Sequence, residues 1–401
     1  MLEVNEFLVL DFVRDRQTTT RSQIAAALGL SPASVSRIVR RLIDAELVRE
    51  GAPTKTRGRP QVTIIFNARA ASVIGIDLGG TKCHGLLADL SGATLHEVVR
   101  PTRQEGAPYP TLAAVLRELD DRARALGLPV AAAAVGVPAV VEPETGLAIG
   151  GPNVHWDGFP IVAELARTTT TPFIVENDVN LAALAHAWRG DARGRSDFAV
   201  IALGTGIGAA VVADGQLVKG RHSAAGEVGF LVLDRSQLRE PRSALGAFER
   251  LAAGPVLADR YRRALTTAGR PVPEALTAAT VFEAARTGEP TARSLVDELV
   301  ERVAMAVIAL ATVVDPETVV LEGSIGQALR PRVAEIQALV AEHVLVPPEI
   351  VVSGLGATAT AIGAVAAALQ LSRHQRAPSA FLDTFRVGID HRRLGLRVDV
   401  A

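Results

Sequence analysis

Two short glycine-threonine segments constrain the fold more than any other feature of the sequence. DLGGTK, residues 77–82, ends one apolar stretch, and LGTGIG, residues 203–208, ends another about 125 residues later. Glycine lets the backbone approach an anion and threonine adds a hydroxyl, so each segment suits a phosphate-binding turn between strands. One such turn is a weak signal. Two of matching kind predict a duplicated fold that holds a nucleotide.

The remaining pattern beyond residue 70 indicates an α/β architecture, because strand-like and helix-like segments alternate. The predicted strands are residues 72–78, 83–90, 130–138, 172–178, 198–206, 207–218 and 318–323, and the predicted helices are residues 110–126, 179–188 and 294–315. No uninterrupted apolar run reaches the roughly 18 residues that would span a membrane. The single cysteine, Cys83, excludes an internal disulfide framework and fits a cytoplasmic location.

Residues 1–66 carry ten Lys or Arg against seven Asp or Glu, a local charge of +3 in a chain whose net charge is −1. Helical patterns precede and follow Gly29, and Ser31 with Pro32 is a typical start for the later helix. Apolar residues of that helix recur at helical spacing, which leaves serines and arginines on its opposite face. Two short strands, residues 47–51 and 61–67, then predict a wing.

This pattern predicts a winged helix-turn-helix that binds DNA. A small helical bundle with a solvated basic face is the alternative, but the turn, the polar helix face and the RGRP segment together favour DNA. Base-edge contacts are expected from the helix face and phosphate or minor-groove contacts from the wing. The predicted DNA-binding residues are Ser34, Ser36, Arg37, Arg40, Lys55, Arg57 and Arg59. One such module reads half of a palindrome, so a homodimer or a dimer of dimers is expected.

A polar segment, VENDVN, lies between the two glycine turns and places Asp178 at the end of a predicted strand. A carboxylate there could accept a proton from a substrate hydroxyl, as phosphoryl transfer requires. Taken alone, Asn177 and Asp178 are more simply explained as caps of the following helix.

Together these motifs resemble the ROK family of repressors and sugar kinases, and the resemblance extends over nearly the whole chain. It implies a two-lobed, actin-like ATPase fold behind the winged helix-turn-helix. It also implies phosphate or nucleotide contacts, with ATP and Mg²⁺ as candidate cofactors, from the two glycine turns: Gly79, Gly80, Thr81, Lys82, Gly204, Thr205 and Gly206. The sugar contacts that it implies are Asn153, Asn177, Asp178 and Glu227, with Asp178 as the catalytic base if the protein is active, and the nearby His222 is a further candidate.

Two departures from the family pattern bear on activity. Phe230 stands where the family commonly has a zinc-binding histidine, and no cysteine follows it, so the family's structural zinc is predicted to be absent and no other metal site is expected. Asp234, Glu240 and Arg242 are candidates for ordering that loop through ion pairs. Glu322 stands where the family commonly has glycine, and a carboxylate beside ATP phosphates would be unfavourable.

The predicted domains are a winged helix-turn-helix at residues 1–68, a first lobe at 70–190, a second lobe at 191–372 and a C-terminal extension of unknown role at 373–401. The favoured hypothesis is a regulator, most simply a repressor, that binds operator DNA and responds to a sugar or sugar derivative without being an enzyme. A sugar kinase with an accessory DNA-binding domain, and a protein with both functions, are the alternatives.

Overall fold

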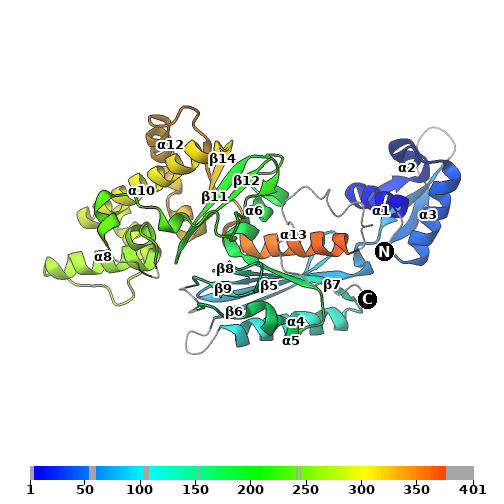
Figure 1. Ribbon diagram of the computed structural model, residues 1–401, viewed down its shortest axis with the longest axis horizontal. Helices are drawn as coiled ribbons and strands as arrows, with labels where there is room; N and C mark the ends of the chain where they lie inside the picture. The colour runs from blue at the N-terminus through cyan, green and yellow to red at the C-terminus, as the bar shows by residue number, and fades with distance from the viewer. Residues whose placement is uncertain are drawn as a thin grey trace.

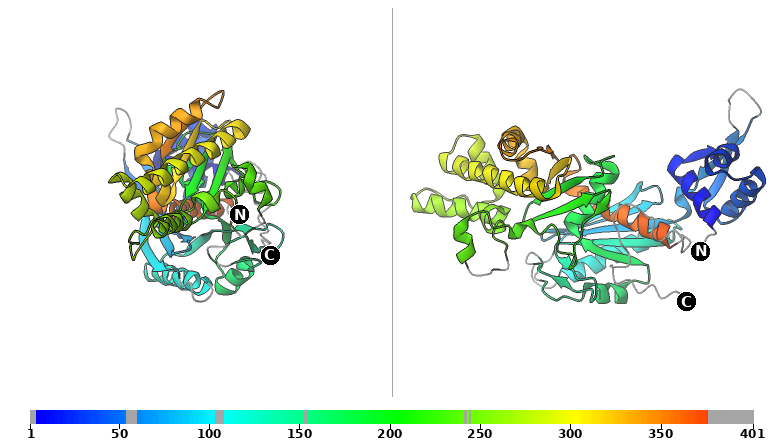
Figure 2. Two further views of the ribbon diagram at one scale, coloured as in Figure 1. Left: turned by 90° about the vertical axis from the view of Figure 1, so that its left-hand side faces the viewer. Right: turned by 45° about the horizontal axis from the view of Figure 1, so that its top comes forward.

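The computed structural model describes residues 4–53, 60–102, 108–151, 154, 156–240, 243 and 245–375. A winged-helix domain stands at one end of a two-lobed body (Figures 1 and 2). Several of the predicted features lie outside the described residues: Asn153, Lys55, Arg57, Arg59, Arg242 and the C-terminal extension from residue 376.

The winged-helix domain has three helices and a three-stranded sheet of order β1-β3-β2. Its elements are α1 (Val4–Arg16), β1 (Thr18–Thr20), α2 (Arg21–Leu28), α3 (Pro32–Asp44), β2 (Val48–Pro53) and β3 (Val62–Phe66). Gly29 ends α2 in the left-handed conformation, with a φ of 65°, and the hydroxyl of Ser31 caps α3 by accepting from the Ser34 amide. The wing strands β2 and β3 pair antiparallel as predicted. The short strand β1, which the sequence pattern did not predict, completes the sheet.

The first lobe is built on a five-stranded sheet of order β10-β7-β4-β5-β6. Helix α4 packs on one face of this sheet and α13 on the other (Figure 1). The lobe's elements are β4 (Ser72–Leu78), β5 (Lys82–Asp89), β6 (Thr94–Pro101), α4 (Tyr109–Ala125), β7 (Val130–Val137), β8 (Val140–Val141), β9 (Ala148–Ile149), α5 (Ile161–Thr168) and β10 (Phe173–Asn177), preceded by a short 3₁₀ turn η1 (Ala68–Ala70).

The second lobe repeats the plan of the first, with a sheet of order β13-β12-β11-β14-β15. In each sheet a hairpin contains the glycine turn: β4 and β5 in the first, β11 and β12 in the second. Two later strands then pair in parallel beside the first strand of the hairpin, β7 and β10 in one sheet and β14 and β15 in the other. This repetition agrees with the predicted duplication. The elements are β11 (Phe198–Leu203), β12 (Ile207–Ala213), β13 (Gln216–Leu217), α7 (Glu249–Ala252), α8 (Gly254–Thr267), α9 (Ala278–Arg286), α10 (Pro290–Val314), β14 (Thr318–Glu322), α11 (Gly323–Ala328), α12 (Val333–Ala341) and β15 (Glu349–Val352), with 3₁₀ turns η3 (Val228–Phe230), η4 (Arg235–Arg239), η5 (Arg330–Arg332) and η6 (Gly356–Thr358).

Two helices, α6 (Asp178–Arg189) and α13 (Ala359–His374), connect the parts of the molecule. They pack so closely that a Cβ atom at Gly363 would lie 1.7 Å from the carbonyl oxygen of Leu181. Helix α6 also contacts β11 and β12 of the second sheet, whereas α13 lies on β4 and β7 of the first. The sequence analysis assigned residues up to 372 to the second lobe, but α13 packs with the first, because the chain returns there after β15.

The winged-helix domain is packed onto the body through a shared apolar core. A single cluster of buried side chains extends from α1 and α3 through β3 to α6 and α13. In Figure 1, α13 points from the middle of the body toward the winged-helix domain. A displacement of α6 or α13 would therefore change the packing of the winged-helix domain against the body.

None of the helices in the described part of the chain combines the length and the apolar character that crossing a membrane requires.

Candidate functional site

A cleft of about 170 Å³ lies where the two sheets face each other, at the ends of the strands that precede the glycine turns. Gly79 and Gly80 reach it from the first lobe, and the turn at 204–206 reaches it from the second. The predicted site residues that line this cleft are Gly79, Gly80, Asn177, Asp178, Gly204, Thr205, Gly206 and Glu227. Residues far apart in the sequence thus surround one space large enough for a small polar ligand.

Asn177 and Asp178 stand at the junction of β10 and α6, and the helix start fixes both side chains. The Asn177 side-chain oxygen accepts from the amides of Val179 and Asn180 at 2.9 and 3.3 Å, which makes Asn177 the N-cap. One Asp178 oxygen accepts from the Val179 amide at 2.9 Å. The capping role considered from the sequence is therefore present, and it also holds the Asp178 carboxyl at the wall of the cleft.

The cleft is rich in carboxyl groups that resist ionisation. Burial, together with the nearby Asp77, raises the pKa of Asp178 to about 7. Burial raises the pKa of Asp77 to about 7, opposed by the charge of Lys82. Burial and Glu249 also raise the pKa of Glu227. A carboxyl that titrates near neutral pH can either donate a hydrogen bond to a ligand hydroxyl or accept its proton.

The other predicted site residues in the described part of the chain are not brought to the cleft wall. Thr81 is exposed, and the Lys82 ammonium donates to the carbonyl oxygen of Ala357 at 3.3 Å, just before α13. His222 is exposed and does not line the cleft. The glycine turn itself is held by Thr102, whose hydroxyl donates to the Gly79 carbonyl at 2.8 Å.

The loop that follows Glu227 is ordered by hydrogen bonds among its own residues. Gln237 accepts from the amides of Leu233 and Asp234 and donates to the carbonyl of Ala247. The carboxylate of Glu249 accepts from the amides of Ile207 and Gly246 at 2.8 and 3.0 Å. Of the three loop residues expected to form ion pairs, Glu240 pairs with Arg250 at 2.7 Å, whereas Asp234 caps the turn η4. Phe230, 48% exposed, lies at the wall of the cleft.

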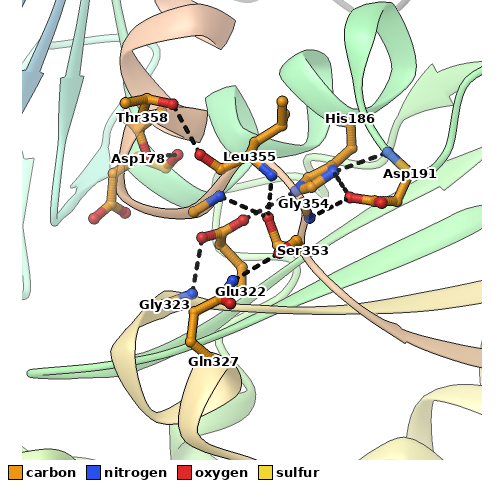
Figure 3. A network of polar contacts seen from close by, with 12 residues as sticks. Asp178, His186, Asp191, Glu322, Gly323, Gln327, Ser353, Gly354, Leu355 and Thr358 are labelled. Carbon is orange, nitrogen blue, oxygen red and sulfur yellow. Dashed lines mark hydrogen bonds and ion pairs between the residues drawn. The ribbon is translucent and has the colours of Figure 1, made fainter. Parts of the chain in front are cut away.

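Glu322 faces a buried histidine, and Gly323 instead lines the cleft. Nε2 of His186, on α6, lies 3.0 Å from one Glu322 oxygen, and Nδ1 of the same ring accepts from the Asp191 amide at 3.3 Å (Figure 3). The other Glu322 oxygen accepts from the Gly323 amide at 2.9 Å. Both Glu322 oxygens therefore have partners, and the carboxylate is not among the groups that line the cleft.

Comparison with known proteins identifies the body of the chain. The model of the ROK family matches residues 73–371, the whole of the two-lobed part that holds the cleft. The chain belongs to the ROK family. A MarR family model matches residues 2–59, a span that includes α1, α2, α3 and β2.

Relatives of this ROK protein include both regulators and kinases. It is 26% identical to the xylose repressor of Caldicellulosiruptor bescii over 331 residues, 80% of this chain and 82% of the relative. It is 30% identical to the glucokinase of Thermotoga maritima over 267 residues, 64% of this chain and 83% of the relative. Among solved structures, a ROK family transcriptional regulator, a homologue of the E. coli MLC protein, matches with a TM-score of 0.75 at 24% identity, covering 92% of this chain and 96% of that one.

The α3 surface of this ROK protein presents the predicted DNA-contacting residues unequally. Ser36, Arg37 and Arg40 are exposed. Neither arginine forms an ion pair or a hydrogen bond with any described residue. Ser34 is half-buried, and its hydroxyl accepts from Ser31 at 2.9 Å. Arg41, on the same helix, pairs with Glu6 of α1 at 2.6 Å, which attaches α3 to the rest of the domain. Arg41 is exposed too, so Arg37 and Arg40 are distinguished as the α3 cations that no ion pair with a described residue neutralises.

Several residues around the cleft were missed by the sequence analysis. Glu249 was missed because nothing local marks a buried carboxylate that accepts from an amide 42 residues away. Outside the cleft lining, a buried ion pair between Lys219 of the second lobe and Glu176 of β10, at 2.5 Å, was also missed. Asp77 could have been found, since it begins the first glycine-threonine segment. No group of three or more His, Cys, Asp or Glu among the described residues is arranged to hold a metal ion.

Proposed function

We propose that this ROK protein is a sugar-responsive DNA-binding transcriptional repressor. One observation carries the proposal: α6 begins at the carboxylate-lined cleft, α13 packs along it, and both share a continuous apolar core with the winged helix. A ligand in the cleft could thereby alter the presentation of α3 to DNA. The names of the xylose repressor and of the regulator with the same two-part architecture support this assignment.

The cleft is the proposed sugar site. Asp178 and Glu227 would exchange hydrogen bonds with sugar hydroxyls, since their raised pKa values allow a carboxyl to donate or to accept. Asn177, whose side-chain oxygen caps α6, would use its amide group. Asn153 and His222 remain proposed contacts from the sequence. Sugar binding would draw the two lobes together and shift the population toward an arrangement that fits DNA poorly.

The DNA-binding surface is proposed to combine α3 with the wing. Ser34, Ser36, Arg37 and Arg40 would contact base edges, and Lys55, Arg57 and Arg59 would contact phosphates or the minor groove. We further propose that the protein acts in the cytoplasm as a homodimer or a dimer of dimers, because two linked winged helices would read two half-sites.

A thermal-shift screen of sugars and sugar phosphates tests the assignment, followed by binding of genomic DNA fragments with and without each ligand that stabilises the protein. The proposal predicts that at least one sugar raises the melting temperature and weakens binding to a selected fragment. A protein that binds no fragment at low ionic strength would contradict the proposal, as would DNA binding that every stabilising sugar leaves unchanged.

A second candidate function is ATP-dependent phosphorylation of a sugar. The specific observation in its favour is that both glycine turns and Asp178, with its pKa near 7, line one cleft, while Glu322 is bound to His186. The backbone amides of the turns would hold nucleotide phosphates, and ATP with Mg²⁺ would supply the phosphoryl group. A coupled assay of ADP release over a panel of hexoses tests it. Turnover abolished by Asp178→Asn would support a kinase, and the absence of turnover with all sugars would reject it.

A further inference from the structure

A second cavity, of about 360 Å³, lies where the winged-helix domain meets the body. Its walls come from the end of α1, the turn after β5, and the C-terminal halves of α6 and α13. The volume is within the range of small-molecule sites. The cavity is separate from the sugar cleft, with which it shares no lining residue.

We propose that this cavity binds a small organic anion, whose carboxylate or phosphate lies against Arg14 and Arg373 and whose apolar part lies against Trp188 and Leu369. The lining joins these two cations to apolar side chains from α6 and α13, and adds the amides of Gln17 and Gln370 at the edge. The proposal concerns a site other than the sugar cleft and does not depend on the repressor assignment.

Arg14 is the more buried of the two cations. Its side chain is only 12% exposed and pairs with Asp11 of the same helix. Its Nε is buried and finds no hydrogen-bond acceptor in the described part of the chain. Burial, and then the positive charge of Arg373, lower the pKa of Arg14 to about 10. A buried charge that is only partly compensated is costly, so an anion lying against the Arg14 guanidinium would stabilise its charged form.

Arg373, near the end of α13, supplies the second cation. Its guanidinium lies 3.8 Å from the carboxylate of Asp15, too far for a good hydrogen bond, and that carboxylate is 64% exposed. Arg373 is therefore only weakly neutralised. Two guanidinium groups lining one cavity suit a carboxylate or phosphate, because each can donate more than one hydrogen bond to such a group.

Trp188 provides a rigid apolar wall. The guanidinium of Arg189 lies 3.7 Å from the centroid of its ring and donates to the carbonyls of Ser91 and Gly92. The ring packs so tightly against Gly92 that a Cβ atom there would lie 2.3 Å from it. An aromatic ring held in this way needs little reordering when an apolar ligand lies against it, which favours binding.

The position of the cavity means that a bound ligand would affect how the winged helix docks on the body. It would contact α1 of the winged helix together with α6 and α13 of the body, so it would bind best to the docked arrangement of the two parts. The ligand would thereby stabilise one orientation of the winged helix.

Isothermal titration of the full chain with hexanoate and with hexyl phosphate tests the proposal, with hexanol and hexylamine as uncharged and cationic controls. We expect at least one of the anions to bind with a Kd of roughly millimolar or below, and the two controls not to bind. Comparison of the anions separates a carboxylate site from a phosphate site. No binding of either anion, or equal binding of all four compounds, would overturn the proposal.

Two variants locate the binding. Arg373→Gln removes a cation, and Ala187→Leu adds bulk at a half-buried position of the cavity wall. Each should raise the Kd of the bound anion roughly tenfold or more. Arg260→Gln is the matched control, since Arg260 is 26% exposed against 32% for Arg373 and lies in the second lobe. Binding that neither cavity variant weakens, or that the control weakens equally, would place the anion elsewhere and overturn the proposal.

Discussion

Nε2 of His186 lies 3.0 Å from a carboxylate oxygen of Glu322, although 136 residues separate the two in the sequence. The histidine is fully buried, and on the other side of its ring a carboxylate oxygen of Asp191 lies 3.2 Å from Nδ1. This contact fastens α6 to the end of β14. Because α6 begins at the cleft and ends near the winged helix, the pair helps to fix the element that connects them (Figure 3).

Removal of the Glu322 carboxylate should destabilise the protein. Glu322→Ala leaves Nε2 of His186 without its partner and α11 without its cap, and we expect the free energy of unfolding to fall by about 1–3 kcal/mol. Glu322→Gln, which keeps a hydrogen-bonding group, should lose less. Urea unfolding measures both. Glu349→Ala, which breaks an exposed ion pair with Arg195, is the control and should cost less than about 1 kcal/mol. Equal losses in the two alanine variants would argue against a special role for the buried pair.

The raised pKa of Asp178 predicts a pH-dependent stability. Its pKa is about 7 in the folded protein against 3.8 ordinarily, so the folded state retains a proton that the unfolded state releases between these values. The contribution of Asp178 to stability is therefore complete below about pH 4 and is lost as the pH rises through 7.

Asp178→Asn has no carboxyl group to ionise, so the variant does not lose this stability as the pH rises. Its stability relative to the parent should therefore be greater at pH 8 than at pH 5, by at least about 1 kcal/mol. Chemical unfolding at both pH values measures the difference. Asp197→Asn is the control, because hydrogen bonds from Ser196 and Asp214 lower the pKa of Asp197, which stays ionised at both pH values. For each variant, the stability relative to the parent is compared between pH 5 and pH 8. If this relative stability changes no more for Asp178→Asn than for Asp197→Asn, the pKa of Asp178 is not raised.

The loop after Glu227 should depend on Glu249. Glu249→Gln leaves one side-chain oxygen where two now accept from the amides of Ile207 and Gly246, so the loop should open more often. Limited digestion with trypsin should then cleave after Arg239 several times faster than in the parent. Glu283→Gln, which removes an exposed carboxylate on α9, should leave the rate unchanged. An unaltered rate in Glu249→Gln would show that other contacts order the loop.

The exposed arginines of α3 should contribute to DNA binding and not to folding. Arg37→Ala or Arg40→Ala should weaken binding to a selected fragment by about 1–3 kcal/mol and relax base preference, with little change in melting temperature. Lys55→Ala should instead weaken binding to all sequences alike and lower its salt dependence. Arg293→Ala, an exposed change on α10, is the control. DNA binding as tight as in the parent for both α3 variants would mean that another surface contacts DNA.

Local signals in the sequence predicted much of the fold. Ser31, Pro32 and Gly29 mark helix ends through their own backbone and side-chain preferences, and the structure has α2 and α3 where these signals place them. The two glycine-threonine turns likewise lie between paired strands, and all of their glycines line the cleft. Such features are specified within a few residues, so a single sequence contains them.

Features set by distant packing could not be predicted. The return of α13 to the first sheet depends on close contacts such as that between Gly363 and Leu181, which have the whole second lobe between them in the sequence. The fit of His186 to Glu322 and of Glu249 to two loop amides arises only after both lobes are assembled. His186 lies on an apolar helix, and nothing near it in the sequence indicates its carboxylate partner, because Glu322 ends a strand 136 residues later.

The coupling between cleft and DNA is tested most directly by one titration. A DNA fragment selected by the protein is bound with and without a saturating concentration of the sugar found by thermal shift, in the parent and in Asp178→Asn. The account predicts that the sugar weakens DNA binding roughly tenfold or more in the parent, and that the variant binds DNA normally but needs much more sugar for the same effect. DNA affinity that saturating sugar leaves unchanged in the parent, or an identical sugar response in the variant, would contradict it.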